Sequence, residues 1–322
     1  MKKICLCLAL CLLLVSARAD EIFGGASSYG EVSYMADDGT RIFHSVDSGG
    51  LKIMSAQGDQ EIALPPEYND IWRMDYTDPL NFTMVCRTDE HYSVLPVQDG
   101  ALQPAVPLPD NACVLHRPLG EHIYYHTAND SRLCRFNWKT GEEETLVPRV
   151  GGLYHADRWH DTDYLIFTLP TKKGEYNGRF FLMTADGAGR CSTPIPLPEG
   201  MDFAASPLCA THRGGVLIAG TPRSEALYNN ASTLYCYDET GKLLWQTSAE
   251  CHAYRLIPTQ EGYTVVGHRG GPVVRREINI NGEPVAEQVY KSFVPGSEFP
   301  VVDGAVYYWP FSDDDPFFIP LE

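Results

Sequence analysis

The sequence lacks the short motifs by which several enzyme classes are recognised. It contains no G-x-S-x-G element of the kind that carries a nucleophilic serine, no phosphate-binding loop and no dinucleotide fingerprint. It also contains no C-x-x-C pair, so a zinc ribbon or a thioredoxin-like redox site has little support. We therefore predict no cofactor and no metal site, and no residue can be assigned a catalytic role.

Positive charge is scarce in this chain. It has 25 Lys and Arg residues against 42 Asp and Glu residues, which gives a net charge of −17 at pH 7. Such a surface repels the phosphates of nucleic acids and anionic lipid headgroups, so neither is expected as a partner. The composition is 44% hydrophobic and 11% aromatic, which is enough for a packed core. The charge therefore indicates a solvated exterior rather than disorder.

A long hydrophobic run is also missing. The apolar stretch over 4–15 is too short to cross a bilayer, which needs about 20 residues. It follows two lysines and precedes a small-x-small pattern at 17–19, an arrangement typical of a secretory signal peptide. We assign residues 1–19 to the signal, with cleavage near Ala19, and residues 20–322 to a single domain. We expect a secreted or periplasmic (extracytoplasmic) protein with no membrane span.

The mature chain keeps an odd number of cysteines: Cys86, Cys113, Cys134, Cys191, Cys209, Cys236 and Cys251. An odd number leaves at least one thiol outside any intramolecular disulfide. We expect most of these side chains to be buried in strands as small hydrophobic residues, and the spacing leaves the disulfide pairing open.

Strand-like apolar runs recur at intervals of about 42 residues. They lie at 41–46, 82–86, 122–127, 164–169, 215–220, 262–267 and 304–309. After each run except the last comes a second run and then a turn that contains a glycine: Gly58, Gly100, Gly141, Gly187, Gly241 or Gly282. Glycine accepts the positive φ angle that tight hairpin turns need. A third run follows each turn, so each unit is predicted to form four short antiparallel strands.

Units of about 40 to 45 residues with four strands are typical of β-propeller blades. We predict an all-β, seven-bladed β-propeller, with six or eight blades as the alternatives. The last unit supplies only three strands, and residues 20–27 are left over at the start. We expect this N-terminal strand to complete the last blade, because each blade buries its faces only against neighbouring blades.

Two stretches resemble known repeat families. Residues 123–147 (IYYHTANDSRLCRFNWKTGEEETLV) resemble a blade of secreted bacterial propellers of the low-density-lipoprotein-receptor-like type. Residues 234–246 (LYCYDETGKLLWQ) resemble the repeat of quinoprotein-like propellers. Each resemblance covers a single blade and implies blade geometry without any catalytic residue. Only one turn glycine is followed four residues later by tryptophan, so we interpret Trp245 as a structural residue between adjacent sheets rather than part of a quinone site.

The innermost strands of a propeller line its axial channel. Four stretches expected there carry ionisable groups, at 72–75, 115–118, 154–160 and 251–256. From them we select as candidate ligand-binding residues Arg73, His116, Arg117, His155, Asp157, Arg158 and Arg255. Guanidinium groups from four blades could converge on an anionic group, or they could pair with carboxylates at blade edges. A metal site built from His155, Asp157, His160, Asp161 and Asp163 is less favoured, because strand alternation points His160 away from the first two.

Two connections are long, at 170–178 and 221–232, and long loops on a rigid scaffold often carry binding sites. Tyr176 and Tyr228 are therefore further candidate ligand-binding residues, as aromatic anchors at the channel mouth. The sequence favours an exported, monomeric, non-catalytic binding or scaffolding module for a protein or carbohydrate partner. The alternative is a propeller hydrolase or lyase acting on a carbohydrate or a small anionic substrate in the channel. The fold does not decide between them.

Overall fold

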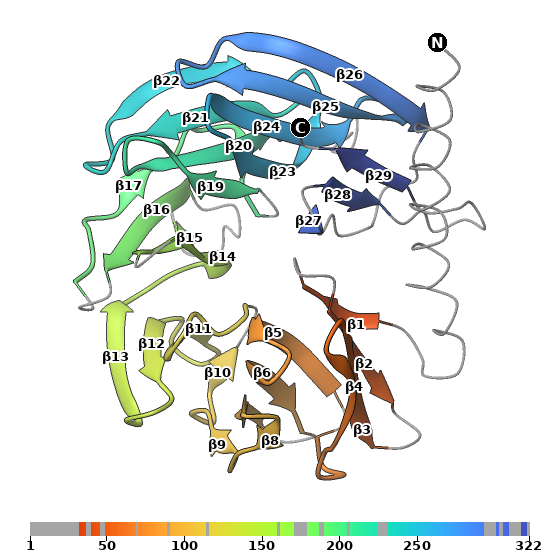
Figure 1. Ribbon diagram of the computed structural model, residues 1–322. Helices are drawn as coiled ribbons and strands as arrows, with labels where there is room; N and C mark the ends of the chain where they lie inside the picture. Colours follow the sequence, from red (N-terminus) through yellow and green to blue (C-terminus); the bar gives the residue numbers. More distant parts are fainter. Residues whose placement is uncertain are drawn as a thin grey trace, which may run out of the picture.

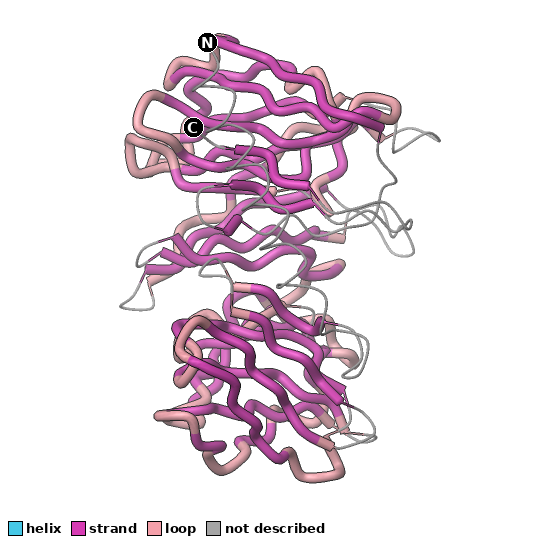
Figure 2. Tube along the Cα trace, turned by 45° about the vertical axis from the view of Figure 1, so that its right-hand side comes forward, coloured by secondary structure: helices cyan, strands magenta, loops and turns pink. Residues whose placement is uncertain are grey.

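A computed structural model describes most of the chain between residues 32 and 320. The described residues are 32–36, 40–45, 49–68, 70–88, 91–113, 116–159, 162–170, 179–186, 190–204, 207–223, 231–292, 301–302, 305–308 and 317–320. Every regular element within these ranges is a β-strand, as Figure 2 shows. No helix in the described part of the chain is long and apolar enough to cross a membrane. The predicted signal at 1–19 and the predicted closing strand at 20–27 lie outside these ranges.

The described strands form seven separate antiparallel sheets, numbered here in chain order. The first sheet contains β1 (Val32–Met35), β2 (Arg41–Ser45), β3 (Gly50–Ser55) and β4 (Gly58–Ala63). The second contains β5 (Asp70–Asp78), β6 (Asn81–Arg87), β7 (Tyr92–Gln98), β8 (Ala101–Leu102) and β9 (Val106–Pro107). The third contains β10 (Ala112–Cys113), β11 (His122–Thr127), β12 (Leu133–Asn137) and β13 (Glu142–Val147).

The remaining sheets follow the same order of pairing. The fourth contains β14 (Gly152–Trp159), β15 (Thr162–Leu169), β16 (Arg179–Asp186) and β17 (Ile195–Pro196). The fifth contains β18 (Met201–Asp202), β19 (Leu208–Ala210), β20 (Val216–Pro222), β21 (Thr233–Tyr237) and β22 (Leu243–Ser248). The sixth contains β23 (His252–Pro258), β24 (Gly262–His268), β25 (Pro272–Asn279) and β26 (Pro284–Ser292). The seventh contains β27 (Val301–Val302), β28 (Ala305–Tyr308) and β29 (Phe317–Pro320).

The prediction of repeated four-stranded antiparallel units is confirmed for several sheets. Each predicted apolar run corresponds to the second strand of a sheet: β2, β6, β11, β15, β20, β24 and β28. Two sheets depart from the simple pattern, because β18 and β19 both pair with β20, and β8 and β9 both pair with β7. These two sheets therefore hold a fifth, short strand each.

The sheets follow one another in chain order around a common centre in Figure 1. The first strands, such as β14 and β23, lie nearest to that centre, and the last strands, such as β13, β22 and β26, lie at the periphery. Burial follows the same direction. Every residue of β24 is buried, whereas four residues of β13 are exposed and none is buried.

The turns before the last strands have the backbone that the sequence predicts. The turn glycines at the described positions all have positive φ angles: Gly58, Gly100, Gly141, Gly241 and Gly282. In the turn between β7 and β8, Asp99 also has a positive φ, of 49°, next to 74° at Gly100. Two consecutive positive φ angles are typical of the two-residue hairpin turn that matches the twist of the strands. The sixth predicted turn glycine, Gly187, lies outside the described residues.

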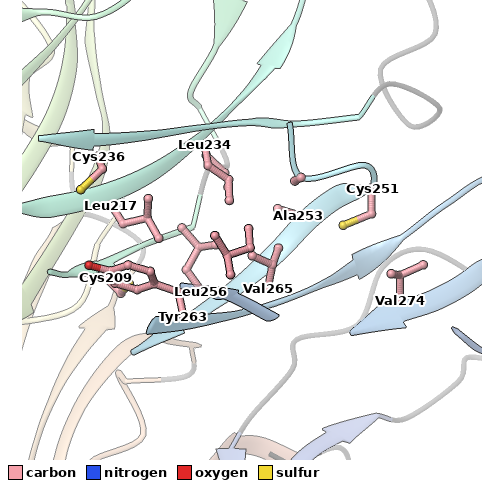
Figure 3. Packing of buried hydrophobic residues seen from close by; sticks show 13 residues of the cluster. Cys209, Leu217, Leu234, Cys236, Cys251, Ala253, Leu256, Tyr263, Val265 and Val274 are labelled. Atoms are coloured by element: carbon pink, nitrogen blue, oxygen red, sulfur yellow. The ribbon is translucent and has the colours of Figure 1, made fainter. Parts of the chain in front are cut away.

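Each hydrophobic core lies between two consecutive sheets. Between the fifth and sixth sheets, Leu217 and Leu234 pack in one cluster with Leu256 and Val265, as Figure 3 shows. Equivalent clusters join the first sheet to the second, the second to the third, the third to the fourth and the fourth to the fifth. Successive side chains of a strand point to opposite faces, so a middle strand contributes to two cores. The neighbouring side chains of Leu217 and Ile218 illustrate this, because they belong to different clusters.

Most of the cysteines are part of these hydrophobic cores. All seven cysteines after residue 19 lie within the described part of the chain, and five of them are buried. Cys209, Cys236 and Cys251 lie together in the core between the fifth and sixth sheets (Figure 3). Only Cys191 is exposed and Cys113 half-buried. The prediction of buried, small hydrophobic cysteines is confirmed for the other five.

The last strand of a sheet also contacts the turn glycine of the next sheet. Trp245 Nε1 donates a hydrogen bond to the carbonyl of Ile280 at 3.0 Å, and a Cβ added to Gly282 would lie 2.6 Å from the indole ring. Gln60 makes the same connection between the first and second sheets, because its Nε2 donates to the carbonyl of Gly100 at 2.7 Å. The interpretation of Trp245 as a structural residue between adjacent sheets agrees with this contact.

We predict that Gly282→Ala lowers the free energy of unfolding more than Gly270→Ala. Both glycines have positive φ angles, 86° and 66°, so alanine at either position costs about 1–2 kcal/mol of backbone strain. Only at Gly282 does the new methyl group also meet Trp245, which adds roughly 1–3 kcal/mol of overpacking. Urea denaturation of the two variants measures the difference. Equal losses would show that the indole contact contributes nothing.

Candidate functional site

The first strands of successive sheets meet near the centre of the arrangement in Figure 1. β14 contacts β19, and β19 in turn contacts β23. The predicted inner stretches at 72–75 and 154–159 lie within the first strands β5 and β14, and most of 251–256 lies within β23. The stretch at 115–118 differs, because β10 ends at Cys113 and residues 116–118 belong to the connection that leads to β11. Pro118 has no N–H group to donate to a strand ladder there.

Arg117 lies between two carboxylates from neighbouring sheets. Its Nη2 donates to Asp157 Oδ1 at 2.5 Å, and its Nη1 lies 3.9 Å from Asp75 Oδ1. Asp75 comes from the second sheet, Arg117 from the third and Asp157 from the fourth, so one guanidinium group links three consecutive sheets. The Arg117 side chain is 37% exposed and that of Asp157 is 27% exposed, so solvent reaches the group.

Sequence reasoning misses Asp75. A signal was available, because Arg73 and Asp75 are two residues apart on one strand and therefore share a face. Asp75 Oδ2 accepts a hydrogen bond from the backbone N–H of Gly120 at 3.0 Å. Burial raises the pKa of Asp75, while the Gly120 hydrogen bond and the charge of Arg117 act in the opposite direction. The Asp75 side chain is 26% exposed, so the carboxyl group is only partly solvated.

The two candidate histidines lie next to each other, and the charge of Asp157 acts on both. The ring centroids of His116 and His155 are 6.0 Å apart in an edge-to-face arrangement. The Nε2 atom of each ring is buried and has no hydrogen-bond partner within the described structure. Burial lowers the pKa of His116 to about 3, helped by the charge of His155 and opposed by a hydrogen bond with the backbone of Leu153. Burial also lowers the pKa of His155, so both rings are neutral at physiological pH.

Arg73 and Arg255 are exposed on β5 and β23. The charge of Arg73 adds to the burial that lowers the pKa of His116. Burial raises the pKa of Cys209, and the charge of Arg255 opposes that shift. The charge of Asp157 acts on both His116 and Cys209. Charges on the inner strands thus act on a group of the third sheet, His116, and on one of the fifth sheet, Cys209.

Arg158 takes a different position. Its Nε and Nη2 donate to the two carboxylate oxygens of Asp163, at 2.5 and 2.9 Å. The hydroxyl of Tyr124 donates to the same carboxylate at 2.6 Å. Asp163 is 3% exposed and Tyr124 belongs to the third sheet, so this group joins the third and fourth sheets. Arg158 thus forms a structural ion pair with Asp163, and its charge also acts on Asp75.

The remaining candidates lie outside the described residues. Tyr176 and Tyr228 belong to the two long connections, which do join β15 to β16 and β20 to β21 as the sequence predicts. His160 and Asp161 of the metal alternative are not described either. Among the residues that are described, no group of three or more His, Cys, Asp and Glu side chains is arranged to hold a metal ion.

Comparisons with known proteins support the fold. No family model matches the chain, and no curated protein matches its sequence. The solved structure of KlHsv2 with loop 6CD replaced by a Gly-Ser linker is similar, with a TM-score of 0.55 and 11% identity over 86% of this chain and 88% of that one. A streptogramin B lyase structure matches with a TM-score of 0.50 and 14% identity over 88% of this chain and 91% of that one. The fold is β-propeller-like.

The same propeller-like architecture appears in dihydro-heme d1 dehydrogenase NirN in complex with DHE. That structure has a TM-score of 0.51 and 12% identity, and the match covers 87% of this chain but only 60% of the dehydrogenase chain. Sequence identities of this size establish a common fold and transfer neither an activity nor a ligand. The function of this propeller-like chain must therefore be argued from its own residues.

We predict that Asp163→Asn strongly destabilises the protein. The substitution leaves Arg158 and the Tyr124 hydroxyl without the charged acceptor that they share between two sheets. The expected loss is about 2–4 kcal/mol of unfolding free energy, below the upper range for fully buried pairs because Arg158 is 30% exposed. The matched control is Glu199→Gln, whose carboxylate pairs with Arg179 but is 78% exposed. A similar loss in both variants would contradict the structural role of Asp163.

Acid should destabilise the protein partly through His116. Its pKa is about 3 in the fold, against an ordinary value of 6.5 that it regains on unfolding. Between these values the unfolded chain binds a proton that the folded chain does not, so the free energy of unfolding falls as the pH falls. Urea denaturation from about pH 7 down to about pH 4 should therefore show a shallower loss for His116→Gln than for the wild type. Parallel pH profiles would show that His116 is not held neutral.

Proposed function

We propose that this protein is an exported, monomeric, seven-bladed β-propeller that acts as a non-catalytic binding or scaffolding module for a protein or carbohydrate partner. The seven sheets of the described chain support this blade count. In the proposal, the N-terminal strand at 20–27 closes the ring and residues 1–19 direct export. The partner contacts the mouth of the axial channel, next to the ion-paired group of Asp75, Arg117 and Asp157.

One observation carries the non-catalytic part of the proposal: the guanidinium group of Arg117 is already paired with a carboxylate of the neighbouring sheet. Arg117 is engaged by Asp157 and lies beside Asp75, and a general base works best when its pKa lies near the operating pH. His116, with a pKa of about 3, is a poor proton acceptor at neutral pH. These residues fit the fixed presentation of hydrogen-bonding groups better than they fit proton transfer.

The scaffold also suits binding. The side chains at the centre come from different sheets, and each sheet is fixed to its neighbours by a shared core. A ligand that meets such residues does not have to order them, which reduces the entropic cost of association. Arg73 and Arg255 are exposed on β5 and β23, the first strands of the second and sixth sheets.

A second candidate is a propeller hydrolase or lyase acting on a carbohydrate or a small anionic substrate. The raised pKa of Asp75 favours it, because a buried carboxyl group can act as a general acid or base. The similarity to streptogramin B lyase concerns the fold alone and adds no catalytic residue.

A thermal-shift screen of residues 20–322 tests the proposal. The probes are neutral oligosaccharides, short peptides and small anions, and each compound that raises the melting temperature is afterwards examined by mass spectrometry. We expect at least one class to stabilise the protein, to be recovered unchanged and to lose its effect in Asp157→Asn. Chemical conversion of a probe would favour the enzyme, and a screen without any stabilising compound would reject the binding module.

A further inference from the structure

The structure places two imidazole nitrogens without hydrogen-bond partners at the centre of the propeller-like fold. The Nε2 atoms of His116 and His155 are both buried, and the described residues offer them no partner. Leaving a buried polar atom unsatisfied is costly, so native proteins seldom do so without a reason. The two atoms belong to neighbouring rings whose centroids are 6.0 Å apart, so one place in the fold presents two ring nitrogens with unused hydrogen-bonding capacity.

We infer that this place receives the hydroxyl groups of an uncharged, hydroxyl-rich ligand, that is, a neutral carbohydrate. The inference rests on the binding function proposed above and names the chemical class of the ligand. It is carried by the arrangement of His116, His155, Arg117 and the two carboxylates.

The tautomer of His116 defines what its Nε2 can do. A hydrogen bond between His116 and the backbone of Leu153 favours the protonated form of the ring, so the ring donates that hydrogen bond. Because Nε2 is the atom without a partner, Nδ1 is the donor. A neutral imidazole that donates through Nδ1 has a lone pair on Nε2 and can only accept there. The complementary ligand group is a hydrogen-bond donor, such as a hydroxyl.

The surrounding charges argue against a charged ligand. An anion would have to displace Asp157 or Asp75 from Arg117, and it would also face the lone pair of His116. An ammonium group would meet the guanidinium of Arg117 and the charge of Arg73, which acts on His116. A hydroxyl group avoids both conflicts.

The carboxylates of Asp75 and Asp157 also favour a ligand that donates hydrogen bonds. Ionised Asp and Glu side chains only accept hydrogen bonds, and each has sites for about four. Asp157 Oδ1 accepts from Arg117 and from the backbone N–H of Arg158 at 2.8 Å, which holds the carboxylate in place. The centre thus offers acceptors on His116 and on two carboxylates, a set that matches neighbouring hydroxyls of a sugar ring.

The test is a calorimetric titration of the wild type with maltotetraose, cellotetraose and chitotetraose, with citrate and sulfate as anions and spermidine as the cation. We expect one of the neutral oligosaccharides to bind and His116→Phe to weaken it roughly fivefold or more, because one hydrogen bond is lost. The matched control is His126→Phe, a half-buried histidine of the same sheet whose pKa is lowered by burial alone; it should keep the wild-type affinity. Long-range nitrogen NMR of the wild type should show His116 protonated at Nδ1, which needs no variant.

The outcomes distinguish a failure of the carbohydrate inference from a failure of the proposed binding function. Binding of citrate or sulfate that is lost in Arg73→Ala, or of spermidine, would overturn the carbohydrate inference and leave a binding module in place. Absence of binding by all of these probes would overturn the inference, whereas the binding module fails only if peptides also have no effect in the wider screen. A proton on Nε2 of His116, or equal weakening in His116→Phe and His126→Phe, would also overturn it.

Discussion

The structure depends on the burial of sheet faces against neighbouring sheets, which the described residues show on both faces of the second to fifth sheets. A lone four-stranded sheet would expose one apolar face, but here consecutive sheets close their faces on each other. Val85 and Cys86 are adjacent in β6 and yet belong to the cores on its two sides. Because each core is shared, a sheet loses two packing surfaces if it opens. The inner strands are held still by this arrangement, and their polar side chains can be placed precisely enough to pair across sheets.

Local patterns in the sequence predict the units but not their contacts. The second strands and the turn glycines are encoded by short apolar runs and by the need for positive φ, so they could be located residue by residue. No such pattern predicts that two short strands, β18 and β19, both pair with β20. The pairing of Arg117 with Asp157 could not be predicted either, because it depends on the angle and height of one sheet relative to the next. Alternation along β5 does predict that Asp75 shares a face with Arg73. It does not predict that Asp75 lies near Arg117, because Arg117 comes from the third sheet.

The centre combines ion-paired side chains with two uncharged histidines. Guanidinium and carboxylate side chains from three sheets form a connected group, while burial keeps the two imidazoles unprotonated. Arg158, which the sequence places next to Asp157, is instead used to join two sheets through Asp163 and Tyr124. Adjacent residues of one strand thus have separate roles, because their side chains point to opposite sides.

The sulfur atoms inside the sheets have a chemical consequence. Burial raises the pKa of Cys251 to about 12 and that of Cys236 to about 11, so these groups remain thiols at any physiological pH. Disulfide exchange requires a thiolate that a soluble reagent can reach. The core between the fifth and sixth sheets is consequently inert to the redox potential of its surroundings, and the same packing results in a reducing or an oxidising medium.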